Sequence, residues 1–434
     1  MPPRPPALPG RPPRRGCLRR ILAAAGLLVL AFLALKSWRA FVDRRLDASW
    51  RQSLGGASFL ERYPDVQDNA TVRDLEKLGA AIGIDMAPAD TPGHVHPAPG
   101  AARRFGAIQE RLKSFLSTNE LSTDGTFKPP SPELVAFLES VRPGLDAIRT
   151  RLAEGPPPVW ARNLSAGLET RLPNYLGPLM LQRLLLLDAG QRLRAGHANE
   201  ATEILETSGR LNEAMADNNP TLACQLIALA VIRLQQPVLR SFPRAPAGWP
   251  ERLRRLDLQS RILRAFRCVA FSIHRTASLD RPAPGGWPGW AEPFPHWMLW
   301  DSIRRVAPVI EDLPKRDVRV FDAKAFEREQ KAAIPRWQIT ARSVFPDYWD
   351  TWPRSAHSEL EAELTALILE ERERLAAGGP PLPFHQRPSR VKGLSWIYED
   401  LPGATVLHLD GDMVYQDQRP VPLRFTVRRG ASVG

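Results

Sequence analysis

Ile21–Leu35, with the sequence ILAAAGLLVLAFLAL, is the stretch that decides how this chain is organised. It is fifteen residues long and has no charged or strongly polar side chain. A transmembrane helix needs about 20 apolar residues to cross roughly 30 Å of hydrocarbon. The eighteen residues between Arg20 and Arg39 span roughly 27 Å as a helix, and Lys36 can extend its ammonium to the headgroups. The stretch therefore predicts a single-pass transmembrane anchor.

A cleaved export signal is the main alternative, because the apolar region of such a signal is about 7–15 residues long. No good small-x-small cleavage site follows Leu35, and the chain continues with KSWR at residues 36–39. Cys17 lies before the apolar run, which disfavours a lipoprotein. The uncleaved anchor is the preferred interpretation, while a cleaved signal and a buried core helix remain open.

Basic residues on both sides of the stretch set its expected orientation. Six arginines and no acid precede it, and four basic residues follow closely. The positive-inside rule therefore favours a cytoplasmic N-terminus. The bulk of the chain is then expected to be extracytoplasmic.

The net charge of +12 is concentrated around this anchor. Residues 1–45 hold ten Arg and Lys side chains and one acid, so the rest of the chain has a net charge of only +3. A basic membrane flank attracts anionic lipid. Nucleic-acid binding is therefore disfavoured, because no basic domain lies outside this flank.

Apolar residues at helical spacing predict a mostly helical chain after the anchor. Asn69 and Ser131 stand where the N-caps of two helices are expected. Pro143 is expected to kink or split the second of these helices, and Gln235–Pro237 to end another. Phe105, Ile108, Leu112 and Phe115 mark a further helix, and others are expected at Leu176–Ala195, Ala198–Met215, Thr221–Leu234, Arg252–Thr276, Met298–Ile310, Asp322–Ala333 and Glu359–Ala377.

One helix pair resembles a tetratricopeptide-like hairpin. Ala189, Gly196, Ala201 and Leu205 have its small–glycine–small–large spacing. The resemblance covers a single hairpin, and no repeat of about 34 residues continues it. It implies helix-pair packing in an antiparallel arrangement.

The pattern becomes alternating after Pro380–Pro383. Asp410-Gly411 is a hairpin signal. Four short strands are expected at Leu394–Tyr398, Thr405–Leu409, Met413–Tyr415 and Leu423–Val427. The predicted fold is thus mainly α: an N-terminal transmembrane helix, a bundle or solenoid-like helical ectodomain and a small C-terminal antiparallel β-sheet.

The layout divides the chain into four predicted parts. They are a disordered basic cytoplasmic tail at 1–20, the anchor and interface at 21–42, the helical ectodomain at 46–385, and the sheet, packed on the helices, at 390–430.

This layout resembles a group of uncharacterised, membrane-anchored bacterial proteins. The resemblance rests on the anchor and on LACQLIALAVIRLQQPVLRSF at 222–242, ELTALILEERERLAAG at 363–378 and WIYEDLPG at 396–403. It implies a location in the bacterial inner (cytoplasmic) membrane with a periplasmic bulk, and it implies no activity.

No nucleophile elbow, phosphate loop, dinucleotide fingerprint, HExxH or EF-hand motif is present in the sequence. His94-x-His96 offers two imidazoles to one metal only if its loop is strand-like, and the nearby acids are Asp85 and Asp90. An exposed loop is the preferred interpretation. Asp410-Gly411-Asp412, followed by Asp417, is interpreted as a hairpin turn rather than a calcium loop.

Two further groups of side chains have a structural and a functional interpretation. Cys224 and Cys268 form either one disulfide or, more in keeping with their apolar helices, two buried thiols. Carboxylates on one helix are suited to acid–base work, but a solvated face is the expected role. They are Glu361, Glu363, Glu370, Glu371 and Glu373.

The densest aromatic cluster lies at residues 287–300. It comprises Trp287, Trp290, Phe294, Trp297 and Trp300. Structural packing is preferred over a groove for a sugar or Pro-rich peptide and over contact with a membrane surface.

A non-enzymatic binding or scaffold module for a protein partner in the envelope is the leading functional hypothesis, and no catalytic, cofactor or metal residue is assigned. The alternative is an envelope hydrolase or glycan-modifying enzyme near the Trp-rich segment 287–300. That alternative requires two convergent carboxylates or a His–acid pair beside Trp287 and Trp290. Stiffening of a larger membrane complex is a third possibility.

Overall fold

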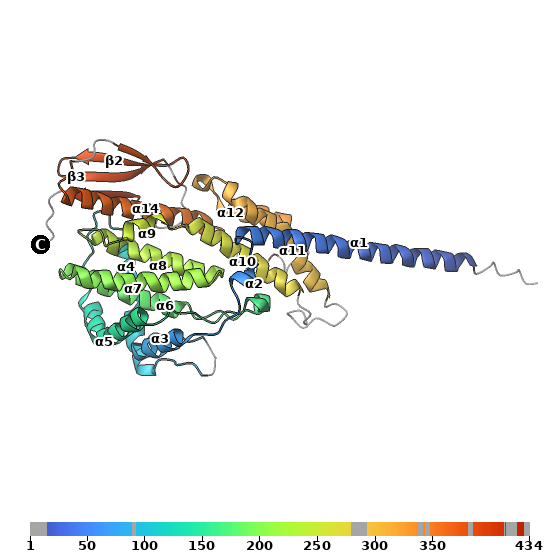
Figure 1. Cartoon of the computed structure of the whole chain (residues 1–434), viewed down its shortest axis with the longest axis horizontal. Helices are drawn as coiled ribbons and strands as arrows, with labels where there is room; N and C mark the ends of the chain where they lie inside the picture. Colours follow the sequence, from blue (N-terminus) through green and yellow to red (C-terminus); the bar gives the residue numbers. More distant parts are fainter. Residues whose placement is uncertain are drawn as a thin grey trace, which may run out of the picture. The chain divides into compact units, whose positions relative to one another are not determined.

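The computed structural model describes residues 15–88, 93–278, 293–336, 342, 348–380, 385–411, 413 and 423–428. Figure 1 shows a mainly helical chain with a small antiparallel sheet near its C-terminus, as the sequence predicts. The chain divides into two compact units, Met1–Ser58 and Phe59–Gly434.

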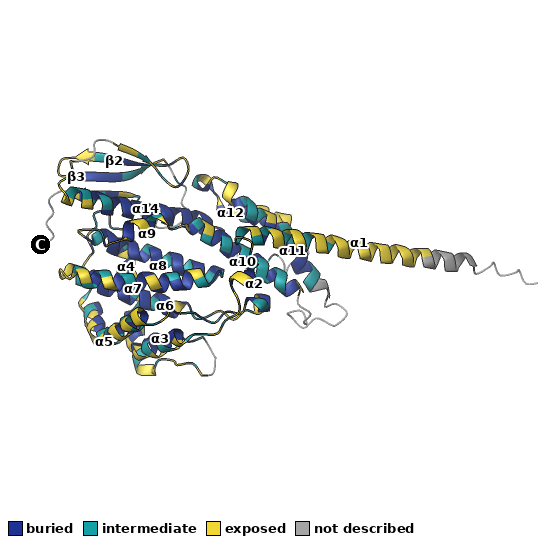
Figure 2. Cartoon of the chain, viewed as in Figure 1, coloured by how far each residue is buried: buried dark blue, intermediate teal, exposed yellow. Residues whose placement is uncertain are grey.

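The first unit contains one helix, α1 (Arg15–Ser53), of 39 residues and about 58 Å. The described part of this helix is long and apolar enough to cross a membrane. Its large apolar side chains from Leu27 to Leu35 are between 51% and 72% exposed, and Figure 2 shows this stretch in yellow. The apolar helix is confirmed, and it continues beyond the apolar stretch to Ser53. Most of the predicted tail at 1–20 lies outside the described residues.

The second unit is built from helices joined mostly by short connections. Figure 1 labels the main ones. Its α-helices are α2 (Phe59–Arg62), α3 (Ala70–Ala81), α4 (Pro99–Glu120), α5 (Pro132–Glu154), α6 (Leu176–Arg194), α7 (Ala198–Asn218), α8 (Leu222–Ser241), α9 (Trp249–Arg254), α10 (Leu258–Ser278), α11 (Pro293–Asp312), α12 (Ala323–Ala333) and α14 (Thr351–Ala376). Three 3₁₀ turns are η1 (Leu164–Glu169), η2 (Leu313–Lys315) and η3 (Val318–Val320).

Both predicted N-caps are confirmed. The Asn69 side chain accepts a hydrogen bond from the amide of Val72 at 3.1 Å, and Ser131 accepts one from Leu134 at 3.4 Å. Each satisfies an amide that has no partner within its helix.

The core forms where α6, α7 and α8 pack on one another and α14 packs on α8. Ala189, Ala201 and Leu205 of the predicted hairpin are fully buried, and Gly196 makes its turn with a φ of +83°. By composition α8 could also span a membrane, but most of its length is buried inside this unit. It is the central helix of the core.

Two prolines lie inside helices that the sequence predicts to kink or end. Pro143 is inside α5 and Pro237 is inside α8. Each proline costs one backbone hydrogen bond. Buried side chains on both sides of each proline outweigh this cost, among them Leu138 and Leu145 in α5 and Val238 in α8.

The single helix predicted at Arg252–Thr276 is wrong, because the chain breaks between α9 and α10. Two carboxylates cap the new helix N-terminus. The side chain of Asp257, directly before α10, accepts from the amide of Ser260 at 3.1 Å, a local cap that the prediction overlooked. The Glu359 carboxylate of α14, about 100 residues away, accepts hydrogen bonds from the backbone amides of Leu258 and Gln259.

The sheet has the order β1-β2-β3-β4, with every neighbouring pair antiparallel. Its strands are β1 (His385–Pro388), β2 (Ser395–Leu401), β3 (Ala404–Asp410) and β4 (Arg424–Arg428). Tyr398, Leu407 and Phe425 lie in one cross-strand row and are buried. β4 packs against α14, as Figure 1 also shows.

Three of the four predicted strands are confirmed with shifted ends, and β1 was missed because HQRP has no alternating apolar pattern. The expected strand Met413–Tyr415 is not found at Met413, and its other residues lie outside the described part. The tight β2–β3 turn contains Gly403, with a φ of +75°. Asp410-Gly411 instead ends β3.

Candidate functional site

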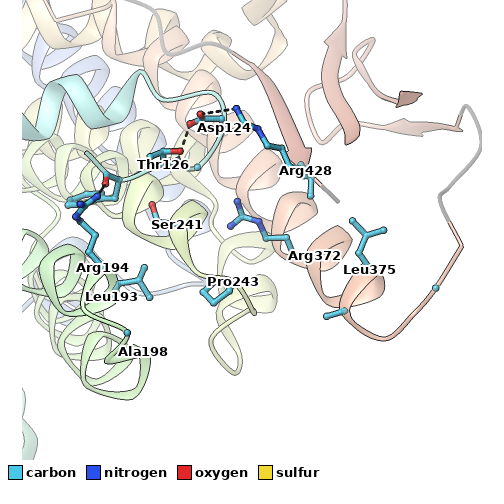
Figure 3. A pocket seen from close by; sticks show the side chains of 16 residues that line it. Asp124, Thr126, Leu193, Arg194, Ala198, Ser241, Pro243, Arg372, Leu375 and Arg428 are labelled. Atoms are coloured by element: carbon cyan, nitrogen blue, oxygen red, sulfur yellow. Dashed lines mark hydrogen bonds and ion pairs between the residues drawn. The ribbon is translucent and has the colours of Figure 1, made fainter. Parts of the chain in front are cut away.

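A cavity of about 840 Å³ lies where the C-terminal ends of α6, α8 and α14 come together. The α4–α5 loop and β4 complete its walls. Figure 3 shows Arg194, Arg372 and Arg428 around it, together with the carboxylate of Asp124. We call this cavity the α8–α14 groove.

The helix ends explain why arginines gather in the groove. The last carbonyls of a helix have no partner within it and carry partial negative charge. Arg372 of α14 donates to the carbonyl of Phe242 at 2.7 Å and also to the carbonyl of Arg240, so it caps α8. Arg194 of α6 donates to the carbonyl of Phe127 at 2.8 Å.

Arg372 has a positive charge that no acid neutralises directly. Burial, followed by the nearby positive charge of Arg240, lowers the pKa of Arg372 to about 10. Among the described residues, no carboxylate lies within ion-pair distance of it. Both of its hydrogen bonds to backbone carbonyls are made by one terminal nitrogen, and the guanidinium lies over the ring of Phe425, with 5.8 Å from Cζ to the ring centroid. Asp124 opposes the lowering of the pKa, but only at a longer distance.

Asp124 is the one acid lining the groove within the described residues, and it is already engaged. Burial alone would raise the pKa of its carboxyl, but hydrogen bonds from Thr126 and Ser122 lower it overall. Its other oxygen lies 3.7 Å from Arg428, whose side chain is 68% exposed at the rim. The groove thus presents a net positive charge beside the apolar side chains of Leu193 and Leu375.

Such an arrangement can bind an anionic group. A guanidinium donates in a planar fork that matches a carboxylate, and it is less strongly hydrated than an ammonium. The groove could not be predicted from the sequence because its walls come from segments more than 300 residues apart. The one local signal was a basic residue near the C-terminal end of each of three predicted helices.

The carboxylates of α14 do not form the solvated face that the sequence predicts. Glu361 is 1% exposed, and Glu363 and Glu371 are also buried. Of the other two, Glu373 is exposed and Glu370 is partly buried. The prediction is wrong because α14 packs on α8, α9 and α10 and also against β4, so little of its circumference is free.

These buried acids are held by partners from other elements. Glu371 accepts from Thr405 of β3 at 3.0 Å and pairs with Arg374 at 2.5 Å. Glu363 accepts from Ser389 at 2.9 Å. The small residues Ser355, Ala356 and Ser358 were the missed signal, since they allow close packing around the first half of the helix.

A second internal network joins α4, α8 and α14. Arg233 lies 3.8 Å from both Glu120 and Glu361. His357 is 3.1 Å from Glu361. Burial raises the pKa of Glu120, against the opposing effect of Arg233. The network ties three core helices together.

The two histidines of the 94–96 loop face different carboxylates. His94 Nδ1 lies 2.9 and 3.0 Å from the two oxygens of Glu76, while His96 Nδ1 lies 3.1 Å from Asp85. The exposed-loop interpretation holds for His96, with 45% of its side chain exposed, but not for His94, with 18%. Asp90 lies outside the described residues.

The two thiols behave as expected of buried cysteines. Cys224 and Cys268 are free, and burial raises the pKa of each to about 12. The disulfide alternative is therefore not found.

The aromatic segment is described only at its C-terminal end. Trp300 is buried in α11 and Trp297 is partly buried. Trp287 and Trp290 lie outside the described residues, as do Asp412 and Asp417. The enzymatic alternative and the calcium loop at these positions therefore stay untested.

In comparisons with protein-family models, curated proteins and solved structures, nothing matches this chain.

Proposed function

We propose that this protein is a single-pass membrane-anchored binding module with a cytoplasmic N-terminus. Its extracytoplasmic helical bundle recognises an acidic segment of a protein partner in the envelope. The exposed apolar stretch of α1, enclosed by cations, supports the anchor. The α8–α14 groove supports the recognition.

The carrying observation is the unneutralised guanidinium of Arg372 in a cavity of about 840 Å³. An incoming carboxylate gains charge-assisted hydrogen bonds there without displacing an acid already bound to Arg372. Arg194 and Arg428 extend the positive charge to opposite walls, and Leu193 and Leu375 add apolar lining. This pattern fits a peptide segment with acidic and apolar side chains better than a small inorganic anion.

The proposal is tested with the full-length chain in detergent and a fluorescent peptide of alternating Glu and Leu. We expect saturable binding that weakens with added salt, because the contacts are charged. Arg428→Glu, which reverses a charge at the rim, is expected to raise the Kd about tenfold, or about 1.4 kcal/mol.

Arg424→Glu is the matched control, because it makes the same charge change on the same strand outside the groove lining. Equal weakening by both substitutions would indicate unspecific attraction and contradict the proposal. So would binding that neither substitution changes.

A further inference from the structure

The residues Asp68, Glu76 and His94 converge on one point at the surface of α3. One ligand atom from each lies within 4.8 Å of the other two. A cavity of about 460 Å³ opens beside them, lined by residues of the 67–77 and 93–95 segments. We propose that these three side chains form a binding site for a divalent transition-metal ion.

Neighbouring hydrogen bonds fix the first carboxylate. Asn69 caps α3, and its side chain also donates to the carbonyl of Pro157 at 2.9 Å. Asp68 is therefore held at the start of the helix, where one of its oxygens accepts from the amide of Ala161 at 2.6 Å. The second oxygen of Asp68 does not take part in this hydrogen bond, and it is the candidate metal ligand.

The second carboxylate is buried on the same helix. Glu76 lies two turns after Asp68 and is only 4% exposed. Its carboxylate faces the imidazole of His94, which the turn at Gly93, with a φ of +86°, brings over the helix. A buried carboxylate next to a second one is costly unless positive charge is nearby. Burial indeed raises the pKa of Glu76 despite the opposing effects of His94.

The distances match the demands of a metal ion. Two ligands each about 2.1 Å from an ion lie about 3.0 Å apart at the right angle of an octahedral site and about 3.4 Å apart at the tetrahedral angle of Zn²⁺, so a small movement fits either ion. His94 Nδ1 and the Glu76 oxygens are 2.9 and 3.0 Å apart. Asp68 completes the set with a small side-chain movement, and the open cavity leaves room for water on the remaining positions.

The donor set selects the class of ion. An imidazole with two carboxylates suits Zn²⁺ or Mn²⁺, whereas Ca²⁺ and Mg²⁺ prefer oxygen donors alone. Arg73 and Lys77 also line the cavity, but both are exposed. Their side chains can turn to solvent, and Lys77 already lies 3.6 Å from Asp74.

A competing explanation is that the Glu76–His94 pair only pins the loop to α3. Asp68→Asn separates the two explanations, because it leaves that pair intact and keeps an acceptor for Ala161. Zn²⁺ and Mn²⁺ binding to the full-length chain is measured by isothermal titration calorimetry at pH 7.5. We expect one equivalent to bind the unaltered protein, and Asp68→Asn, Glu76→Gln and His94→Gln each to weaken binding at least tenfold.

His96→Gln is the matched control, because it removes the other His–acid pair of the same loop. We expect it to leave the affinity unchanged. The absence of stoichiometric binding of either ion would overturn the proposal. Equal losses in His96→Gln and His94→Gln, or full affinity in Asp68→Asn, would also overturn it.

Discussion

Individual carboxylates of α14 hold segments that lie far from them in the sequence. Glu359 caps the N-terminus of α10, while Glu363 and Glu371 accept hydrogen bonds from side chains 26 and 34 residues away. Each buried acid is useful only because a specific donor meets it; without that donor it costs about 1–3 kcal/mol. Residue identity alone did not reveal this role, because an acid on a helix is exposed more often than buried.

Glu359 leads to a prediction about pH. Burial raises the pKa of Glu359 above its usual 4.5 despite the opposing amide hydrogen bonds. The folded chain therefore holds this proton more tightly than the unfolded chain, and the free energy of unfolding falls as the pH rises from 4.5 through the raised pKa. Glu359→Gln removes this fall in the free energy of unfolding, because glutamine does not titrate. The free energy of unfolding of the variant minus that of the unaltered protein is expected to be larger at pH 7 than at pH 4. Urea unfolding of both proteins at the two pH values measures this difference.

Glu373→Gln is the control, since Glu373 is exposed on the same helix. Its effect on the free energy of unfolding is expected to be small, because an exposed side chain is replaced by one of similar shape. A Glu359→Gln difference that stays constant, or that changes in the opposite direction, would show that burial does not set this titration.

At the scale of secondary-structure elements, helices were what the sequence predicted best. The apolar spacing located α3 to α8 and α14 because each buries a stripe against its neighbours. It failed where the decisive partner is distant. The α9–α10 break depends partly on Glu359, the burial of α14 depends on α8, α9 and α10, and the groove depends on three helix ends meeting.

Pro143 provides a prediction at the same scale. It is exposed inside α5, between the buried residues Val141 and Leu145. Pro143→Ala restores the hydrogen bond to the carbonyl of Glu139 and removes the clash of the ring. We expect it to raise the free energy of unfolding by about 1–3 kcal/mol.

Pro132→Ala is the paired control, because Pro132 occupies the first turn of the same helix. Proline suits that position, so the substitution is expected to be neutral or slightly destabilising. Chemical unfolding followed by circular dichroism measures both. Equal effects of the two substitutions would contradict this account of α5.

At the scale of the whole molecule, two units have opposite surface chemistry. Unit Met1–Ser58 exposes leucines, valine and phenylalanine along one long helix. Unit Phe59–Gly434 buries such residues around α6, α7 and α8 and carries little net charge outside its arginine groove. The exposed apolar surface of the first unit is of the kind that marks a contact with a membrane or another protein. The proposed membrane anchor accounts for this surface.

The direct test of this organisation is a pair of reporter fusions at the C-terminal end of the full-length chain. One reporter is an alkaline phosphatase, which is active only outside the cytoplasm, and the other is a green fluorescent protein, which fluoresces only inside it. The proposed topology predicts phosphatase activity in the membrane fraction and no fluorescence. A fluorescent fusion without phosphatase activity would contradict it, and the proposed envelope partner would fall with it.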